Sequence, residues 1–133
     1  MSTETFRSAV NAELVAWQAA GFPTLPLIFE NGPAPDEDKI GRIWLDAEIR
    51  WYGGMIVSVG SKPLTRDTGA LSFMCYYKDG EGTKQSDQIV DSLADRFEAR
   101  RLGGAFLKAK QRTVPTHLRG WYKTGILVPF TLD

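Results

Sequence analysis

The segment 42–52 alternates between an apolar set of side chains and a set that carries its charges. The apolar parity consists of Ile43, Leu45, Ala47, Ile49 and Trp51. The opposite parity consists of Arg42, Trp44, Asp46, Glu48, Arg50 and Tyr52. A period of two predicts a β-strand with one face on the core and the other toward solvent, which is typical of antiparallel sheets. We therefore expect a half-buried antiparallel strand here.

Two amphipathic helices are predicted, one before and one after the central strands in the sequence. The first begins at Thr3 and runs to about Ala20, before Gly21 and Pro23. Its apolar stripe consists of Phe6, Val10, Leu14 and Trp17. The second covers roughly 84–101, and its stripe consists of Ile89, Leu93 and Phe97, with Val90 and Ala94. Both stripes have the spacing of a helix that lies on a core.

The remaining segments predict further strands. We expect them at 25–29, 55–59, 70–77, 105–114 and 121–131, with Gly53-Gly54 ending the strand before 55 and loops at 31–38 and 60–68. The order of helix, three or four strands, helix, two strands predicts an α+β fold. We expect a single domain over residues 1–133, with a central, mainly antiparallel sheet of about five strands flanked by two α-helices.

The composition excludes several classes of protein. The chain is 43% hydrophobic and 24% charged, unlike a disordered chain. It has one cysteine, which excludes an internal disulfide framework and a multi-cysteine zinc site. No apolar run approaches the ~18 residues of a membrane-spanning helix, and the N-terminus has no signal-peptide pattern. We therefore expect a protein that stays in a cytoplasm.

The charges sum to zero, with 16 basic and 16 acidic side chains, but they are unevenly spread. Residues 1–95 hold 14 acidic against 8 basic side chains, whereas residues 96–119 hold seven basic side chains and only Glu98. A dedicated nucleic-acid binder is usually strongly basic overall, which this chain is not. The basic segment is compatible with a nucleic-acid patch, with head-to-tail contact between copies, or with an ordinary solvated helix end.

Candidate reactive residues are few. Cys75 falls on the apolar face of a predicted strand, where a thiol behaves as a small hydrophobe. His117 falls in a loop or at a strand end. A Cys75–His117 nucleophile pair is one hypothesis. Two ordinary structural residues are the alternative.

Two further motifs have structural alternatives. Asp36, Glu37 and Asp38 offer oxygen ligands for a hard cation, but their spacing does not match a calcium loop, and a charged loop tip is the simpler account. The turn at 80–84 resembles the end of a phosphate-binding loop but lacks its full pattern. Trp44, Tyr52 and Trp121 fall on the less apolar strand faces, where exposed aromatics often mark interfaces.

Three features in chain order carry a resemblance over nearly the whole chain. An amphipathic helix precedes Pro-Leu-Ile-Phe-Glu-Asn-Gly-Pro-Ala-Pro at 26–35. Arg-Asp-Thr-Gly at 66–69 opens a strand that ends in Asp-Gly-Glu-Gly at 79–82. The chain ends in Gly-Trp-Tyr-Lys-Thr at 120–124 and Val-Pro-Phe at 128–130. The sequence is similar to the tail-terminator (tail-completion) proteins of long-tailed bacteriophages, and to related small prophage proteins of unknown role.

The resemblance implies a structural protein with no enzymatic activity and no cofactor. Such proteins form a hexameric ring on the tail tube, which stops its polymerisation and allows the head to join. The implied partners are other copies of itself, tail-tube proteins and head–tail connector proteins, with no specific nucleic acid and no membrane. The implied location is the cytoplasm of the bacterial host and then the virion tail.

The charge distribution and the predicted loops add expectations about contacts. We expect the subunit interface to use basic residues, namely Arg96, Arg100, Arg101, Lys108, Lys110 and Arg112. We expect tail or head proteins to contact loop residues, namely Lys62, Arg66, Asp36, Glu37 and Asp38. The alternative is a small anion- or nucleic-acid-binding module that uses the helix start near Thr83 and the basic segment 96–119.

Overall fold

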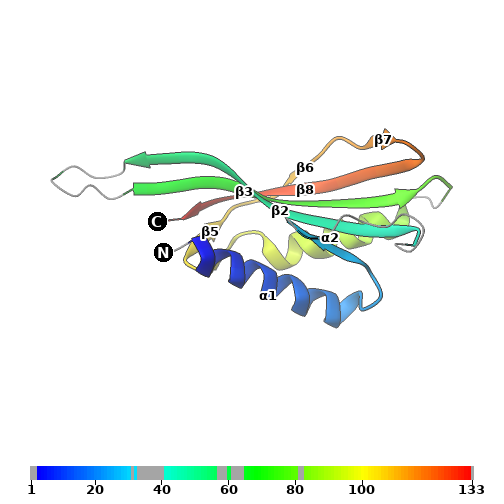
Figure 1. Ribbon diagram of the computed structural model, residues 1–133, viewed down its shortest axis with the longest axis horizontal. Coiled ribbons are helices and arrows are strands. Elements are labelled where there is room, and N and C mark those ends of the chain that lie inside the picture. Colours follow the sequence, from blue (N-terminus) through cyan, green and yellow to red (C-terminus); the bar gives the residue numbers. More distant parts are fainter. Residues whose placement is uncertain are drawn as a thin grey trace.

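The computed structural model describes residues 3–30, 32, 41–56, 60, 65–80 and 83–132. Over these residues the protein has an α+β fold with two helices and one mixed sheet (Figure 1). The helices are α1 (Thr3–Gly21) and α2 (Lys84–Phe97). The strands are β1 (Leu27–Phe29), β2 (Ile43–Ile56), β3 (Thr65–Lys78), β4 (Arg100–Leu102), β5 (Ala105–Leu107), β6 (Gln111–Arg112), β7 (Thr116–Leu118) and β8 (Trp121–Leu132).

Both helices form where the apolar stripes predict them. The buried residues of α1 are Phe6, Val10, Leu14 and Trp17, as expected. Helix α2 ends at Phe97, four residues before the predicted end. Glu98 adopts an extended conformation and Ala99 has a positive φ of 56°, so the chain leaves the helix and enters β4. The prediction that the helix extends to 101 is therefore wrong.

Three long strands form the centre of the sheet. β2 pairs antiparallel with β3, and β3 pairs antiparallel with β8 along most of its length. The full order is β1-β2-β3-β8-β5-β4, and β6 and β7 also pair with β8. Every pairing is antiparallel except that of β1 with β2. The described part of the chain thus has eight strands rather than the predicted five or so.

The additional strands come from short segments along one edge of β8. The predicted strand 105–114 is interrupted, because only 105–107 and 111–112 pair with β8 before β7 resumes the pairing. Gly53-Gly54 does not end β2 as predicted. A register shift between Trp51 and Gly53 forms a bulge, and the strand continues to Ile56. Residues 65–68, predicted as loop, belong to β3.

The core lies between the helices and one face of the sheet. Figure 1 shows α1 and α2 on the same side of the sheet, so both helices cover one of its faces. Fully buried side chains from both layers meet there, namely Phe6, Leu14, Leu45, Leu71, Phe73, Ile89, Leu93, Phe97, Ile126 and Phe130. Trp17 Nε1 donates to Ser92 Oγ at 2.9 Å and joins the two helices. We call the face of the sheet that packs against the helices the helix-side face, and the opposite face the outer face.

The far ends of β2 and β3 project from the rest of the molecule. Figure 1 shows this two-stranded ribbon extending beyond the helices and beyond the end of β8. β8 pairs with β3 only from Asp67 to Lys78, so Met55 and Ile56 pair with Arg66 and Thr65 and, in the described part, with no third strand. We call residues 52–56 and 65–68 the arm. Its tip, residues 55–56 and 65–66, extends past β8, whereas Asp67 and Thr68 at its base still pair with the last residues of β8.

Candidate interaction surfaces

Four of the six basic residues predicted at a subunit interface form ion pairs inside the chain. Arg96 Nε and Arg100 Nη1 both donate to Glu13 Oε1 of α1, at 2.5 and 3.0 Å. The hydrogen bond from Arg96 is the main reason why the pKa of Glu13 lies below its ordinary value, although burial opposes the shift. The basic segment is therefore joined to an acidic residue that lies more than eighty positions away in the sequence.

The other two pairs connect the edge of β8 to α2. Arg112 forms an ion pair with Asp91, and Lys110 Nζ lies 3.7 Å from Glu98 Oε1. These side chains are partly exposed, and pairs of this kind usually stabilise a fold by less than about 1 kcal/mol each. The ion pairs have a larger effect on the surface charge, because acidic residues pair with four of the seven basic side chains in residues 96–119.

Arg101 and Lys108 are the exposed basic residues that remain. Among the described residues neither forms an ion pair, and the Arg101 guanidinium lies 5.7 Å from the centre of the Phe106 ring. The predicted interface at these six residues stays a prediction. Of the predicted contact loops, Arg66 lies on β3 opposite Met55 and is half-buried. Lys62, Asp36, Glu37 and Asp38 lie outside the described residues.

The structure does not bring Cys75 and His117 together. Cys75 has no solvent exposure on the helix-side face, where burial first and the Asp87 charge second raise the pKa of its thiol to about 12. His117 lies on β7, with β8 between it and β3, so the two backbones are roughly 10 Å apart. His117 Nε2 is 3.1 Å from Asp79 Oδ1, and its ring packs on Tyr122. A buried thiol far from this histidine is not an activated nucleophile.

The region of the predicted anion site contains a cavity of about 430 Å³. The lining residues are Tyr77, Lys78, Gly80, Thr83 and Tyr122. Thr83 has no side-chain cap bond to α2, and its carbonyl accepts the Ser86 hydroxyl at 2.9 Å. The Lys78 ammonium lies 4.4 Å from the Trp121 ring and so already has an aromatic partner. Within the described residues, no group of three or more His, Cys, Asp or Glu is placed to hold a metal ion.

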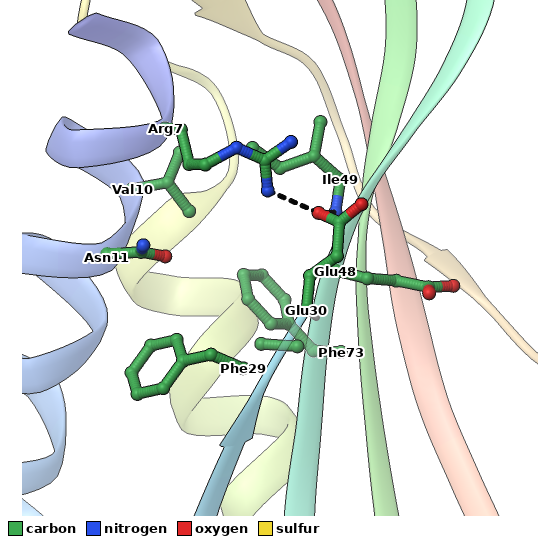
Figure 2. Close-up of a pocket in the computed structure, with 9 residues that line it drawn as sticks. Arg7, Val10, Asn11, Phe29, Glu30, Glu48, Ile49 and Phe73 are labelled. Carbon is green, nitrogen blue, oxygen red and sulfur yellow. Dashed lines mark hydrogen bonds and ion pairs between the residues drawn. The ribbon is translucent and has the colours of Figure 1, made fainter. Parts of the chain in front are cut away.

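A second, small cavity lies between α1 and the sheet (Figure 2). Its volume of about 40 Å³ is enough for a water molecule or two. Figure 2 shows Arg7 of α1 reaching to Glu30, while Glu48 points away from the cavity. Burial alone would raise the pKa of Glu30, but the bonds from Arg7 and the Ile49 N–H outweigh it and the pKa is lowered. Because Arg7 and the Ile49 N–H already bind the Glu30 carboxylate, this cavity is a structural feature and not a candidate binding site.

The outer face carries a cluster of aromatic and lysine side chains at the end opposite the arm. Trp44 and Tyr76 are stacked, with ring centres 4.1 Å apart and planes 3° apart. Trp121 meets Trp44 edge-on at 6.3 Å. Lys78 lies over Trp121, and Lys123 lies 5.8 Å from the Tyr76 ring centre. We call these five residues the aromatic–lysine patch.

Strand register brings the patch together. Trp44 is opposite Tyr76, Tyr76 is opposite Lys123, and Lys78 is opposite Trp121. Trp44 and Trp121 were predicted as candidates from the sequence, whereas Tyr76, Lys78 and Lys123 were not. The only sequence signal for these three residues was their alternation along β3 and β8, which puts them on the outer face. No described helix covers this face, so the patch is a candidate interaction surface.

Asp46 follows the patch on the same face of β2. Burial first, and the neighbouring charge of Glu48 second, raise the pKa of its carboxyl, while Lys123 acts in the opposite direction. A carboxylate on an open sheet face is usually well solvated. Its partial burial shows that the surrounding side chains already exclude water from part of this face.

Comparisons with known proteins establish the fold alone. No protein-family model matches the chain, and no curated protein is similar to it. One solved structure is similar over 100% of this chain and 96% of its own, with a TM-score of 0.77 and 18% sequence identity. The name of that protein states no function. No described helix is long and apolar enough to cross a membrane.

Proposed function

We propose that this protein is a structural subunit of a bacteriophage tail. In this proposal, copies form a ring of the tail-terminator type, which caps the tail tube and allows the head to join. The observation that supports it best is the arm, whose two-stranded tip extends past the helices and past β8. A pair of strands alone is marginally stable in water, so a surface on another molecule is the natural place for it to lie.

The rest of the molecule is compatible with an assembly role. A closed ring needs two unlike surfaces on each copy, because every subunit presents one surface to one neighbour and the other surface to the next. The sheet offers this asymmetry, since the arm projects at one end and the aromatic–lysine patch, which no described helix covers, lies at the other. The net charge of zero means that no strong long-range repulsion separates identical copies.

The partners in this proposal are other copies of the chain, the tail-tube protein and the proteins that connect tail and head. The protein would be made in the cytoplasm of the bacterial host and then incorporated in the virion tail. It would need no cofactor and would act by binding, with no catalytic step.

The decisive test is deletion of the gene from its prophage, followed by induction and electron microscopy of the particles. We expect overlong tail tubes, or tails of normal length that lack heads. Complementation with the intact gene should restore headed tails of normal length. Normal, infectious particles from the deletion strain would contradict the proposal.

A second candidate function rests on the cavity beside Thr83 and Lys78. It is a small anion-binding module that recognises phosphate or the backbone of a nucleic acid. Titration with inorganic phosphate and with a short DNA duplex at moderate salt separates the two candidates. Saturable binding that Lys78→Ala abolishes would support the module, whereas the assembly role predicts no such binding.

A further inference from the structure

The two edges of the sheet differ in how they are protected against strand pairing. The edge formed by β4, β6 and β7 is short and interrupted, and it carries charged residues and a proline, namely Arg100, Arg101, Lys110, Arg112 and Pro115. Natural proteins use such features to prevent pairing with other chains. These features disfavour the pairing of another strand with this edge.

The opposite edge is open along the arm. β1 covers β2 only from Leu45 to Ala47, and the Glu30 carboxylate then accepts the Ile49 N–H. Residues 51–56 follow, and they contain no charged residue and no proline. Tyr52 is 62% exposed, the highest value among the large aromatic side chains of the described residues. The described part of this edge, residues 51–56, thus carries neither the charges nor the proline found on the opposite edge.

No described helix covers the aromatic–lysine patch, in which Trp121 is buried and the other four residues are partly exposed, and the arm of the same copy cannot reach it. Trp44 and Tyr52 lie eight residues apart on one strand, which corresponds to roughly 26 Å. Both belong to a sheet whose strands are held in register, so the arm cannot fold back onto the patch. Among the described residues, no other segment of the same copy lies over the patch or the arm, which leaves both for another molecule.

The chemistry of the two surfaces is complementary. The patch offers aromatic rings of Trp44 and Tyr76 and two ammonium groups, those of Lys78 and Lys123. The arm offers the exposed ring of Tyr52 and the exposed carboxylate of Asp67. Aromatic side chains of this kind are enriched in protein interfaces, and opposite charges fix the register of a contact.

We propose that the arm of one copy lies across the aromatic–lysine patch of the next copy, with Tyr52 against the Trp44–Tyr76 stack and Asp67 facing Lys78 or Lys123. The two surfaces are unlike and lie at opposite ends of one sheet, so the proposed contact can repeat head-to-tail from copy to copy, as a ring requires. The inference rests on the proposed ring and names the contact that would build it.

Cysteine crosslinking tests the contact. Cys75 is fully buried, so an introduced exposed cysteine is the reactive one. The experiment mixes a Tyr52→Cys chain with a Lys123→Cys chain and applies mild oxidation, both on the purified protein at high concentration and on tails assembled in cells that produce both variants. The matched control replaces Lys123→Cys with Val15→Cys, an exposed position on α1.

We expect the Tyr52→Cys and Lys123→Cys mixture to give at least tenfold more crosslinked dimer than either variant alone or than the Val15→Cys mixture. Crosslinking of Tyr52→Cys with itself to the same extent would mean that two arms pair, and would overturn the inference. So would the absence of the mixed product in both the purified protein and the tails.

The two proposals fail in different ways. If tails depend on the gene and light scattering shows assembly, but no mixed crosslink forms, the ring stands and this contact is wrong. If the deletion strain makes normal particles, the proposed function fails whatever the crosslinking shows. A second measurement protects against variants that fold poorly. Asp67→Lys, which places a cation opposite Lys78 and Lys123, should weaken association at least tenfold with an unchanged unfolding midpoint, whereas Val15→Ala should change neither.

Discussion

The Glu30 carboxylate accepts the backbone N–H of Ile49, with 3.1 Å between Oε2 and the nitrogen. The bond takes the place of a third strand, because β1 ends at Phe29 and β2 continues without it. The same carboxylate pairs with Arg7 and so attaches α1 to this edge of the sheet. One side chain thus ends the parallel pairing and marks where the open edge of β2 begins.

Loss of this carboxylate should destabilise the fold. Glu30→Ala leaves the Ile49 N–H and the Arg7 guanidinium without their acceptor, and we expect a loss of about 1–3 kcal/mol in urea unfolding at pH 7. Glu30→Gln keeps an acceptor oxygen, so its loss should be smaller. Equal losses in the two variants would show that the charge, and not the backbone bond, is what matters.

The same residue predicts a pH dependence. The pKa of Glu30 is lower in the folded protein than its ordinary value of 4.5, so its contribution is present above that value. The contribution is lost as the pH falls through the folded-state pKa. The stability difference between the protein and Glu30→Gln should therefore shrink between about pH 5 and pH 3, as measured by unfolding at each pH.

The pKa of Asp46 is shifted in the opposite direction to that of Glu30. Its pKa in the folded protein is raised above 3.8, so folding favours the protonated carboxyl, and the stability that this supplies is lost as the pH rises through the folded-state pKa. Asp46→Asn should be more stable than the protein at pH 7, and the gain should disappear near pH 3. Asp95→Asn, at an exposed position on α2, serves as the control and should change stability by less than about 0.5 kcal/mol.

Gly125 is required by close packing between β8 and β3. A Cβ there would lie 2.0 Å from the Phe73 carbonyl oxygen and 2.8 Å from Met74 Sδ. Gly125→Ala should therefore destabilise the fold by several kcal/mol or abolish it, because backbone atoms must move. Gly21→Ala, where a Cβ meets nothing within 4 Å, should be neutral or slightly stabilising. Thermal unfolding of both variants provides the comparison.

The basic residues separate into two groups by their contacts. Arg100→Glu places a like charge beside Glu13 and should destabilise the fold. Arg101→Glu and Lys108→Glu alter exposed side chains and should change unfolding free energy by less than about 0.5 kcal/mol each. If the basic residues contact a neighbouring copy, this pair should weaken self-association, as measured by light scattering. Unchanged association in the double variant would exclude Arg101 and Lys108 from the interface.

The periodic segments were predictable from the sequence. The stripe of Phe6, Val10, Leu14 and Trp17 forms a helix, and the alternation around Leu45 and Ala47 forms a strand. Each of these patterns spans enough residues for burial of one face to decide the local conformation. The α+β class follows from the order of such segments, and it is confirmed.

Short strands and the surface clusters depended on tertiary structure. β4, β6 and β7 have two or three residues each, too few for a periodic signal, and they form because the long edge of β8 or the neighbouring β5 offers partners. The bulge at Trp51 and Gly53 lets β2 continue where the glycine pair predicted an end.

The sequence by itself determined which faces of the long helices and strands are apolar, because that follows from residue spacing alone. Which distant side chains meet depended on how the helices and strands pack together. This packing neutralised the basic segment with Glu13 and Asp91, and it assembled Trp44, Tyr76 and Lys123 across three strands. Spacing along the chain carries no information about strand register or about which acid lies beside which base, and those depend on how the layers pack.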